Sequence, residues 1–361
     1  MVNKTYRELI KQHTFMDNLS IGSEDIKGSE DDVACPRDGV ILFDKAAVKK
    51  AFDKEFRADR KTVLKELYEE CNIRSYATIN KNIFTDLDRL ARQFGNFTEV
   101  IRLCQTRLTL FKLASPQVIS LPPILSVGPP GVGKTRFLKE MAKVLRTDFF
   151  SLDFSTMSSG FILAGGASSW SDSKPGFISE SLRESEFANP IILLDEIDKS
   201  NTSLRFDPLG CLYSLLETHS AKNFRDEFLE VEMDMSHIIW FATANNPNTI
   251  PAPIRSRMTE INIELPTHEQ AKTIVKSIYS ETLASYPWGT KFTDKLDIEV
   301  VEELATNPPR QVRKQLELAL ANAASRAGRK RKQIKLETAD LDNQVGVEKK
   351  QKSGIGFLAT F

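Results

Sequence analysis

The chain has 361 residues, and its 49 basic and 49 acidic side chains give a formal charge of zero at neutral pH. This balance excludes a histone-like coat of positive charge, and 41% hydrophobic with 27% charged residues excludes wholesale disorder. The sequence contains no run of about 18 apolar residues, and its first residues lack the apolar stretch of a signal peptide. We therefore expect a soluble, cytoplasmic protein with no membrane segment.

Four cysteines are scattered along the chain without a CxxC pair, and the four histidines form no cluster with them. They are Cys35, Cys71, Cys104 and Cys211. Because zinc sites and disulfide frameworks usually show closely spaced pairs, we expect neither a structural zinc nor a disulfide.

Residues 1–93 are expected to form an N-terminal helical region that is partly flexible. The first forty residues are polar, with an acidic patch from Ser23 to Asp32. From Lys45 onward, apolar residues recur at the three-to-four spacing of one helical face. A second run with this spacing extends from Leu87 to Phe111, and Gly95 is expected to break it into two helices.

The pattern changes at Pro116, where short apolar runs begin to alternate with helical periodicity. The runs Ile124–Val127, Ile191–Leu194 and Ile238–Thr243 have the length of buried strands. This alternation predicts an α/β fold with a mainly parallel sheet flanked by helices. The Gly/Ser-rich residues 155–176 predict a long loop, and helical spacing returns after about Pro266.

A phosphate-binding motif directly follows the strand at Ile124–Val127 and opens the next helix. The residues expected to bind ATP are Gly128, Pro129, Pro130, Gly131, Val132, Gly133, Lys134 and Thr135. Glycines let backbone N–H groups wrap a phosphate, while Lys134 bridges the β- and γ-phosphates and the Thr135 hydroxyl holds Mg²⁺. A strand before the motif and a helix after it are the context this chemistry requires.

Two further strands end in polar residues suited to ATP hydrolysis. Asp195 follows Ile191–Leu194 and is expected to hold Mg²⁺, and Glu196 is expected to polarise the attacking water. The strand at Ile238–Thr243 runs on to Asn245, which is placed to position that water or to contact the γ-phosphate. Alone, each residue also fits an ordinary solvated strand end.

Four phrases, GPPGVGKT, LLDEIDK, FRDEFLEVEMDMSHIIWFATANN and IPAPIRSRM, occur in this order and resemble the ATPase module of Lon-type proteases within the AAA+ superfamily. The resemblance covers roughly residues 94–345. It implies an AAA+ large subdomain at 94–265, a small helical C-terminal lid at 266–345 and a tail at 346–361. It also implies a ring-shaped homo-oligomer, expected to be a hexamer.

The resemblance assigns further roles by position in these motifs. Asn245 matches the sensor-1 residue, and Arg257 matches the arginine finger that reaches a neighbouring subunit's nucleotide, with Arg255 as the alternative. Arg310 matches the sensor-2 residue at the start of a lid helix, in preference to Arg313.

Trp170 aligns with the aromatic of the family's first pore loop, which grips a substrate polypeptide. An indole in so polar a loop suggests a binding role, although a buried anchor explains it too. The sequence departs from the family at Ser171, where an aliphatic residue is expected. Upstream, Phe97, Val100 and Ile101 occupy the place where the family surrounds adenine, and core packing explains them equally well.

These features predict an Mg²⁺-dependent ATPase ring that remodels or unfolds a protein partner. Only 51 residues follow Arg310, so we expect no proteolytic domain. Two alternatives stay open: a DNA-associated AAA+ ATPase, for which the basic stretch Arg326–Lys332 is the local support, and a nucleotide-dependent assembly switch. The apolar tripeptide Ile355–Phe357 is a candidate docking peptide for a separate peptidase.

Overall fold

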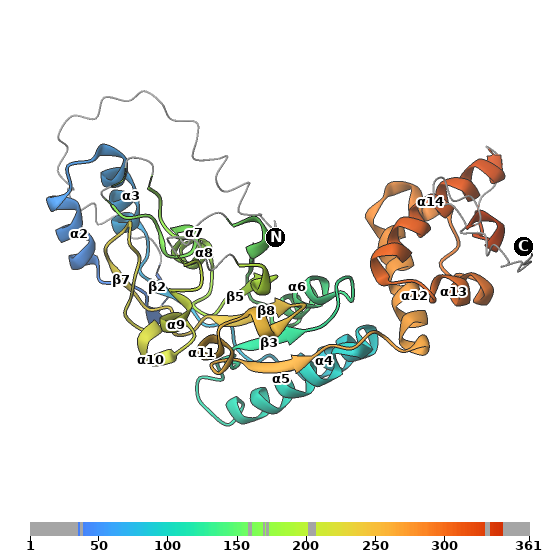
Figure 1. The fold of residues 1–361 in the computed structure, drawn as a ribbon, viewed down its shortest axis with the longest axis horizontal. Coiled ribbons are helices and arrows are strands. Elements are labelled where there is room, and N and C mark those ends of the chain that lie inside the picture. The colour runs from blue at the N-terminus through green and yellow to red at the C-terminus, as the bar shows by residue number, and fades with distance from the viewer. Residues whose placement is uncertain are drawn as a thin grey trace, which may run out of the picture. The chain divides into compact units, whose positions relative to one another are not determined.

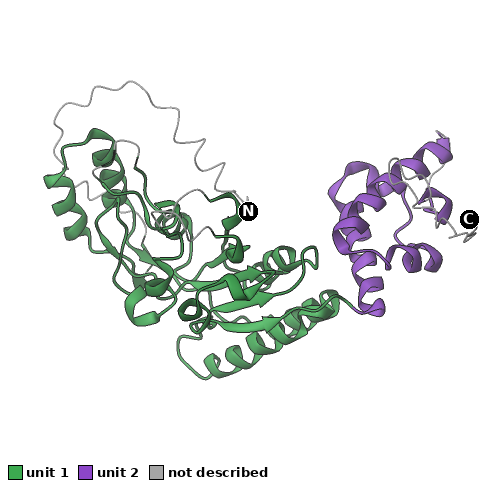
Figure 2. Ribbon diagram, viewed as in Figure 1, with its two compact units in different colours: residues 1–266 green, residues 267–361 purple. Residues whose placement is uncertain are grey.

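The computed structural model describes residues 35–36, 39–157, 161–168, 170, 173–200, 207–328 and 333–341. The chain divides into two compact units, residues 1–266 and residues 267–361 (Figure 2). Two hydrophobic clusters fill the first unit and one fills the second. Within the described part of the chain, no helix is long and apolar enough to cross a membrane.

A five-stranded sheet forms the centre of the first unit (Figure 1). In spatial order its strands are β4 (Phe149–Asp153), β5 (Ile191–Asp195), β8 (Ile239–Ala244), β3 (Ile124–Val127) and β9 (Thr259–Asn262). All neighbouring strands are parallel, so their carboxyl ends meet at one edge of the sheet. The α/β fold expected from the sequence is confirmed.

Ten helices and two small antiparallel pairs are described around this sheet. The helices are α2 (Lys45–Lys54), α3 (Ala58–Glu69), α4 (Ile83–Gln93), α5 (Thr98–Phe111), α6 (Lys134–Leu145), α7 (Phe161–Ala164), α8 (Phe177–Glu184), α9 (Leu212–Leu215), α10 (Thr218–Ala221) and α11 (Ala252–Arg255). The pairs are β1 (Val40–Ile41) with β2 (Ile73–Arg74), and β6 (Phe224–Arg225) with β7 (Glu232–Met233).

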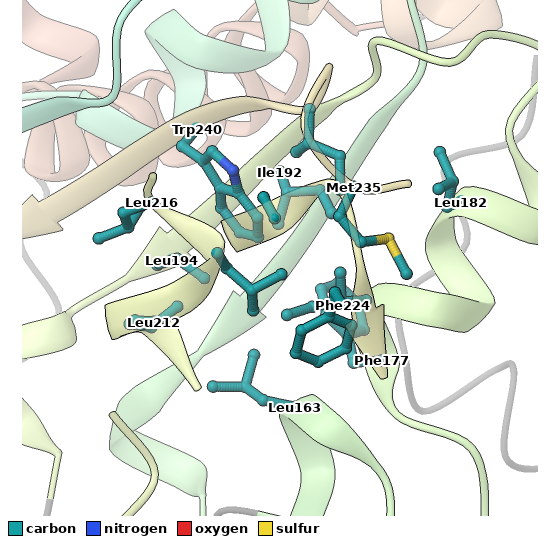
Figure 3. Packing of buried hydrophobic residues seen from close by; sticks show 14 of the residues in the cluster. Leu163, Phe177, Leu182, Ile192, Leu194, Leu212, Leu216, Phe224, Met235 and Trp240 are labelled. Atoms are coloured by element: carbon teal, nitrogen blue, oxygen red, sulfur yellow. The ribbon is translucent and has the colours of Figure 1, made fainter. Parts of the chain in front are cut away.

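Successive side chains along each central strand lie on opposite faces of the sheet and belong to different hydrophobic clusters. In β5, Ile191 and Leu193 join the cluster that contains residues of α4, α5 and α6, whereas Ile192 and Leu194 join the cluster on the other face. Figure 3 shows this second cluster, in which Ile192 and Leu194 lie with Trp240 and with side chains of α7, α8 and α9. Both faces are covered, which explains why the strands read as unbroken apolar runs.

The helices before residue 94 also contribute to these cores. Val48 of α2 and Leu64 and Leu67 of α3 belong to the same cluster as Ile192 and Leu194. Residues of α4 belong to the cluster on the opposite face. Helices α2, α3 and α4 therefore share hydrophobic cores with the central sheet.

The structure corrects the expectation about disulfides, because Cys35 and Cys71 are bonded to each other. The two residues are 36 positions apart, so no short-range spacing marks them as a pair. Cys104 and Cys211 are free, and burial raises the pKa of each thiol to about 12.

Three α-helices are described in the second unit. They are α12 (His268–Ser285), α13 (Ile298–Leu304) and α14 (Pro309–Ala327). Thr267 begins α12 with a capping box, in which its backbone N–H donates to Gln270 Oε1 at 2.8 Å and its hydroxyl accepts from the Gln270 N–H. Apolar residues of all three helices share one cluster, so this unit has its own core.

Phe137 offers a test of the first unit's packing. It is fully buried in α6 and stacks on Phe97 with ring centroids 4.3 Å apart. We expect Phe137→Ala to lower the free energy of unfolding by about 3–5 kcal/mol, because it leaves a cavity in a close-packed core. Phe56→Ala is the matched control, since Phe56 is 96% exposed and its loss is expected to change little. Equal urea-unfolding midpoints for the two variants would contradict this packing.

Candidate nucleotide-hydrolysis site

The phosphate motif forms the connection between β3 and α6. Gly131 and Gly133 have φ angles of 84° and 98°, a region that residues with a Cβ rarely adopt. Gly133 is also the N-cap residue that precedes α6, so the first N–H groups of the helix point toward the loop. The geometry gives a positively polarised cradle at the carboxyl edge of the sheet.

Lys134 contacts the end of β8 as well as its own loop. Its ammonium donates to Asn245 Oδ1 at 3.0 Å, to the carbonyl of Ala244 at 3.3 Å and to the carbonyl of Gly128. Burial lowers the pKa of Lys134, and the carboxylates of Asp195, Asp198 and Glu196 oppose that shift. The structure therefore brings together Lys134 and Asn245, which are 111 residues apart.

Asp195 joins three elements at this edge. One carboxylate oxygen accepts from the Thr135 hydroxyl at 2.8 Å, and the other accepts from the Thr243 hydroxyl. The Thr243 hydroxyl also accepts from the Glu196 N–H at 3.0 Å. Sequence reasoning assigned no role to Thr243, although a polar residue in an otherwise apolar strand was the available signal.

Glu196 and Asp198 follow Asp195 in a short turn. Glu196 has a φ of 54°, and such left-handed backbone in a residue other than glycine is often found at functional sites. Asp198 was also missed: its side chain is almost fully buried, and one oxygen accepts from the N–H groups of Asn245 and Asn246 at 3.2 and 3.1 Å. Asp198 thereby fixes the segment that carries Asn245.

The donor set fits a magnesium nucleotide. Thr135 and Asp195 supply a hydroxyl and a carboxylate oxygen 2.8 Å apart, and oxygen ligands of this kind suit Mg²⁺. The N-terminus of α6 and the Lys134 ammonium suit the phosphates. Mg²⁺ would neutralise phosphate charge there, while Glu196 is the carboxylate available to orient a water.

The two arginines considered for the finger role lie near the start of β9. Arg255 pairs with Glu260 of that strand at 2.8 Å, and Arg257 pairs with Glu217 at 2.7 Å. Because β3 and β9 are parallel neighbours in register, the start of β9 lies at the opposite end of the sheet from the phosphate motif. Four residues of strand separate these ends by about 13 Å.

The remaining predicted residues lie elsewhere. Arg310 is exposed in the first turn of α14, in the second unit, so it is described separately from the phosphate motif. Phe97, Val100 and Ile101 are at most 1% exposed and belong to the core around Phe137, so core packing accounts for them.

Trp170 lies in a loop that leads from β4 to α8. We call the described residues 165–168, 170 and 173–176 the Trp170 loop. The indole is 43% exposed and meets Phe161 edge-on with ring centroids 4.7 Å apart. It is therefore a partly exposed side chain that contacts Phe161, and it is not the fully buried anchor that was the alternative.

Asp226 fixes the base of the Trp170 loop. Its fully buried carboxylate accepts from the Gly176 N–H at 2.8 Å and from the Ser179 hydroxyl at 2.7 Å. The other oxygen accepts from the N–H groups of Phe228 and Leu229 at 2.9 and 3.0 Å. Burial raises the pKa of this carboxyl, and these hydrogen bonds oppose the shift.

Five earlier expectations concern residues outside those the structure describes. They are the acidic patch Ser23–Asp32, Ser171, most of the basic stretch Arg326–Lys332, the tail at 346–361 and the tripeptide Ile355–Phe357. Arg326 is described, and its guanidinium pairs with Asp340 at 2.7 Å and Glu337 at 3.0 Å within its own unit.

Part of the sequence matches the model of a known protein family. Residues 124–266 match the model of the ATPase family associated with various cellular activities (AAA), a span that contains the phosphate motif, Asp195, Glu196 and Asn245. Residues 124–266 are therefore similar to an AAA ATPase domain, and this match supports ATP hydrolysis at the site. Their parallel sheet carries the phosphate motif at its carboxyl edge.

Lon proteases are among the relatives of this ATPase domain. The chain is 39% identical over 153 residues to the Lon protease of Wolbachia pipientis subsp. Culex pipiens, covering 42% of this chain and 19% of the relative. It is 27% identical over 231 residues to the Lon protease of Metamycoplasma arthritidis, covering 64% of this chain and 26% of the relative. The match therefore spans about a quarter or less of these relatives' length.

A solved structure confirms the fold at greater distance. The structure titled as a closed-state reconstruction of Hsp104 with ATPγS and FITC casein matches with a TM-score of 0.55 and 16% identity. The match covers 70% of this chain and 49% of that one. At this identity the likeness concerns the AAA+ fold alone.

Two substitutions separate nucleotide binding from hydrolysis. We expect Lys134→Ala to abolish ATP binding because it removes the cation at the phosphates. Glu196→Gln is expected to keep binding and to lose turnover, since only the group that orients water is changed. Fluorescent-nucleotide titration and steady-state phosphate release measure the two effects. Wild-type turnover by Glu196→Gln would overturn the role given to Glu196.

Proposed function

We propose that this protein is an ATP-driven machine that remodels or unfolds polypeptides, with Trp170 as the side chain that contacts the client. The observation that carries the proposal is an exposed indole on a loop whose base is fixed inside the ATPase domain by buried Asp226. Aromatic side chains give broad apolar contact with few rotamers to order, which suits binding that does not depend on client sequence.

A short path joins the Trp170 loop to the nucleotide site. The chain leaves β4 after Asp153, which is the register partner of Asp195 at the end of β5, and it enters the Trp170 loop after α7. It returns through α8, the helix that precedes β5. A change at Asp195 on nucleotide binding or hydrolysis therefore acts on the two strands between which the loop is connected. This arrangement supports the use of ATP energy at Trp170.

The position of Arg257 supports an assembly in which subunits share sites. Arg257 lies at the end of the sheet opposite to its own phosphate motif, so it is poorly placed to reach its own nucleotide. In a ring, the same position supplies a cation to the next subunit's γ-phosphate. We therefore propose a ring-shaped homo-oligomer, with a hexamer as the expected form. We propose that Arg310, in the second unit, is the sensor-2 residue.

Neither alternative function gains support from the described residues. Arg326 is the basic residue of this stretch among those described, and it is engaged by Asp340 and Glu337, so it offers little to a DNA phosphate. A slow assembly switch would not need both Asp195 and Glu196. Remodelling of a protein partner in the cytoplasm remains our proposal.

Trp170→Ala tests the client-contact role. With casein as an unstructured polypeptide probe, we expect this variant to lose most of the casein-stimulated increase in ATP turnover, because the apolar contact is gone. Leu113→Ala is the matched control, since Leu113 is 85% exposed and lies outside the loop. Equal stimulation of Trp170→Ala and wild type would contradict the proposal.

Mixed oligomers test the shared site. Arg257→Ala and Lys134→Ala chains are each expected to be inactive alone. Mixing them should restore part of the turnover, because some interfaces then pair an intact Lys134 with an intact Arg257. A finger supplied in trans contributes on the order of 10³-fold in related phosphate chemistry, so the recovery should be well above background. Absence of recovery in oligomers shown to be mixed would count against a trans arginine.

A further inference from the structure

The segment between α2 and α3 contacts the Trp170 loop, although it lies outside the residues matched by the family model. Arg57 donates from one guanidinium nitrogen to the carbonyls of Ser168 and Trp170, and to the Ser173 hydroxyl at 3.1 Å. Figure 1 shows α2 and α3 on the same side of the unit as α7, α8 and β7. The contacts join residues more than a hundred positions apart in the chain.

The same turn is fixed to the hairpin formed by β6 and β7. Arg60 is 5% exposed and donates to the carbonyls of Phe228 and Leu229 at 2.6 and 3.0 Å. It also pairs with Glu55, whose carboxylate accepts from the N–H groups of Phe56 and Arg57. A buried, fully engaged arginine thus sets the position of the turn, and Arg57 extends from it to the loop.

Glu230 contacts both Arg60 and the Trp170 loop. Its carboxylate accepts from the Ser168 hydroxyl at 2.6 Å and lies 3.4 Å from the Arg60 guanidinium. Its φ of 53° is left-handed, an unfavourable conformation for glutamate that the surrounding contacts maintain. Ser168 is therefore held from two sides, by Arg57 at its carbonyl and by Glu230 at its hydroxyl.

Arg57 bonds directly to the backbone of the Trp170 loop. Its described residues are small or polar apart from Trp170, and the Trp170 carbonyl accepts from the Ser173 hydroxyl at 2.8 Å as well as from Arg57. Arginine suits this task because one guanidinium nitrogen donates to the loop while the other two pair with Asp59, whereas lysine has a single nitrogen for both partners. The Asp59 carboxylate pairs with the same guanidinium and orients it.

We propose that Arg57 is a positioning residue for the Trp170 loop, holding its backbone at Ser168 and Trp170 so that the indole stays presented to a client polypeptide. This inference rests on the proposed client-contact role of Trp170. It makes the α2–α3 turn a part of the client-handling apparatus. A displacement of α2 and α3 would therefore move the loop.

Hydrogen–deuterium exchange tests, without any client present, whether Arg57 holds the Trp170 loop. Arg57→Ala is expected to speed exchange at the amides of Trp170 and Ser173 at least about fivefold, because these amides bond within the loop that Arg57 holds. Arg57→Lys should be intermediate. Arg89→Ala is the matched control, since Arg89 is 73% exposed and forms a comparable ion pair with Asp86 on α4. Unchanged loop exchange in Arg57→Ala would overturn the proposal.

Casein-stimulated ATP turnover provides the functional measurement. We expect Arg57→Ala to raise the casein concentration for half-maximal stimulation several-fold, with turnover in the absence of casein and the thermal unfolding temperature close to those of Arg89→Ala. If Trp170→Ala reduces stimulation and Arg57→Ala does not, Arg57 is not a positioning residue. If Trp170→Ala has no effect, the client-contact role fails instead, and the exchange measurement alone then decides whether Arg57 holds the loop.

Discussion

The candidate nucleotide site depends on the two hydrogen bonds that the Asp195 carboxylate accepts. Its two hydrogen bonds reach Thr135 at the start of α6 and Thr243 at the end of β8, so one side chain fixes three elements of the sheet edge. Thr243 in turn holds the N–H of Glu196. Because parallel strands place their carboxyl ends together, these contacts arise from residues that are far apart in the sequence.

Lys134 gives this edge a second connection. Its ammonium contacts Asn245 and backbone carbonyls, all of them neutral oxygen acceptors. A γ-phosphate is a stronger partner for this half-buried cation, since both groups of the hydrogen bond are then charged. Binding of ATP at the motif would therefore draw Lys134 from Asn245 and change the contacts of β8. This change in the contacts of β8 is a physical means by which the site would respond to a bound nucleotide.

The local part of this account could be predicted from the sequence. The phosphate motif and the apolar strands around it define their own structure, because glycine conformation, strand length and helix start are short-range properties. The long-range contacts could not be predicted. Asp198, Asp226, Arg57 and Arg60 act on backbone groups up to 169 residues away, and no spacing indicates such partners. The Cys35–Cys71 disulfide was missed for the same reason.

Photo-crosslinking from position 170 tests the central claim that ATP energy acts on a polypeptide at this loop. With the photoreactive residue benzoylphenylalanine in place of Trp170 and labelled casein as the probe, the account predicts crosslinks that form with ATP and Mg²⁺ and decline with ADP. The same photoreactive residue at position 113, an exposed site outside the loop, should give only background. Crosslinking that is equal at the two positions, or independent of the nucleotide, would contradict the account.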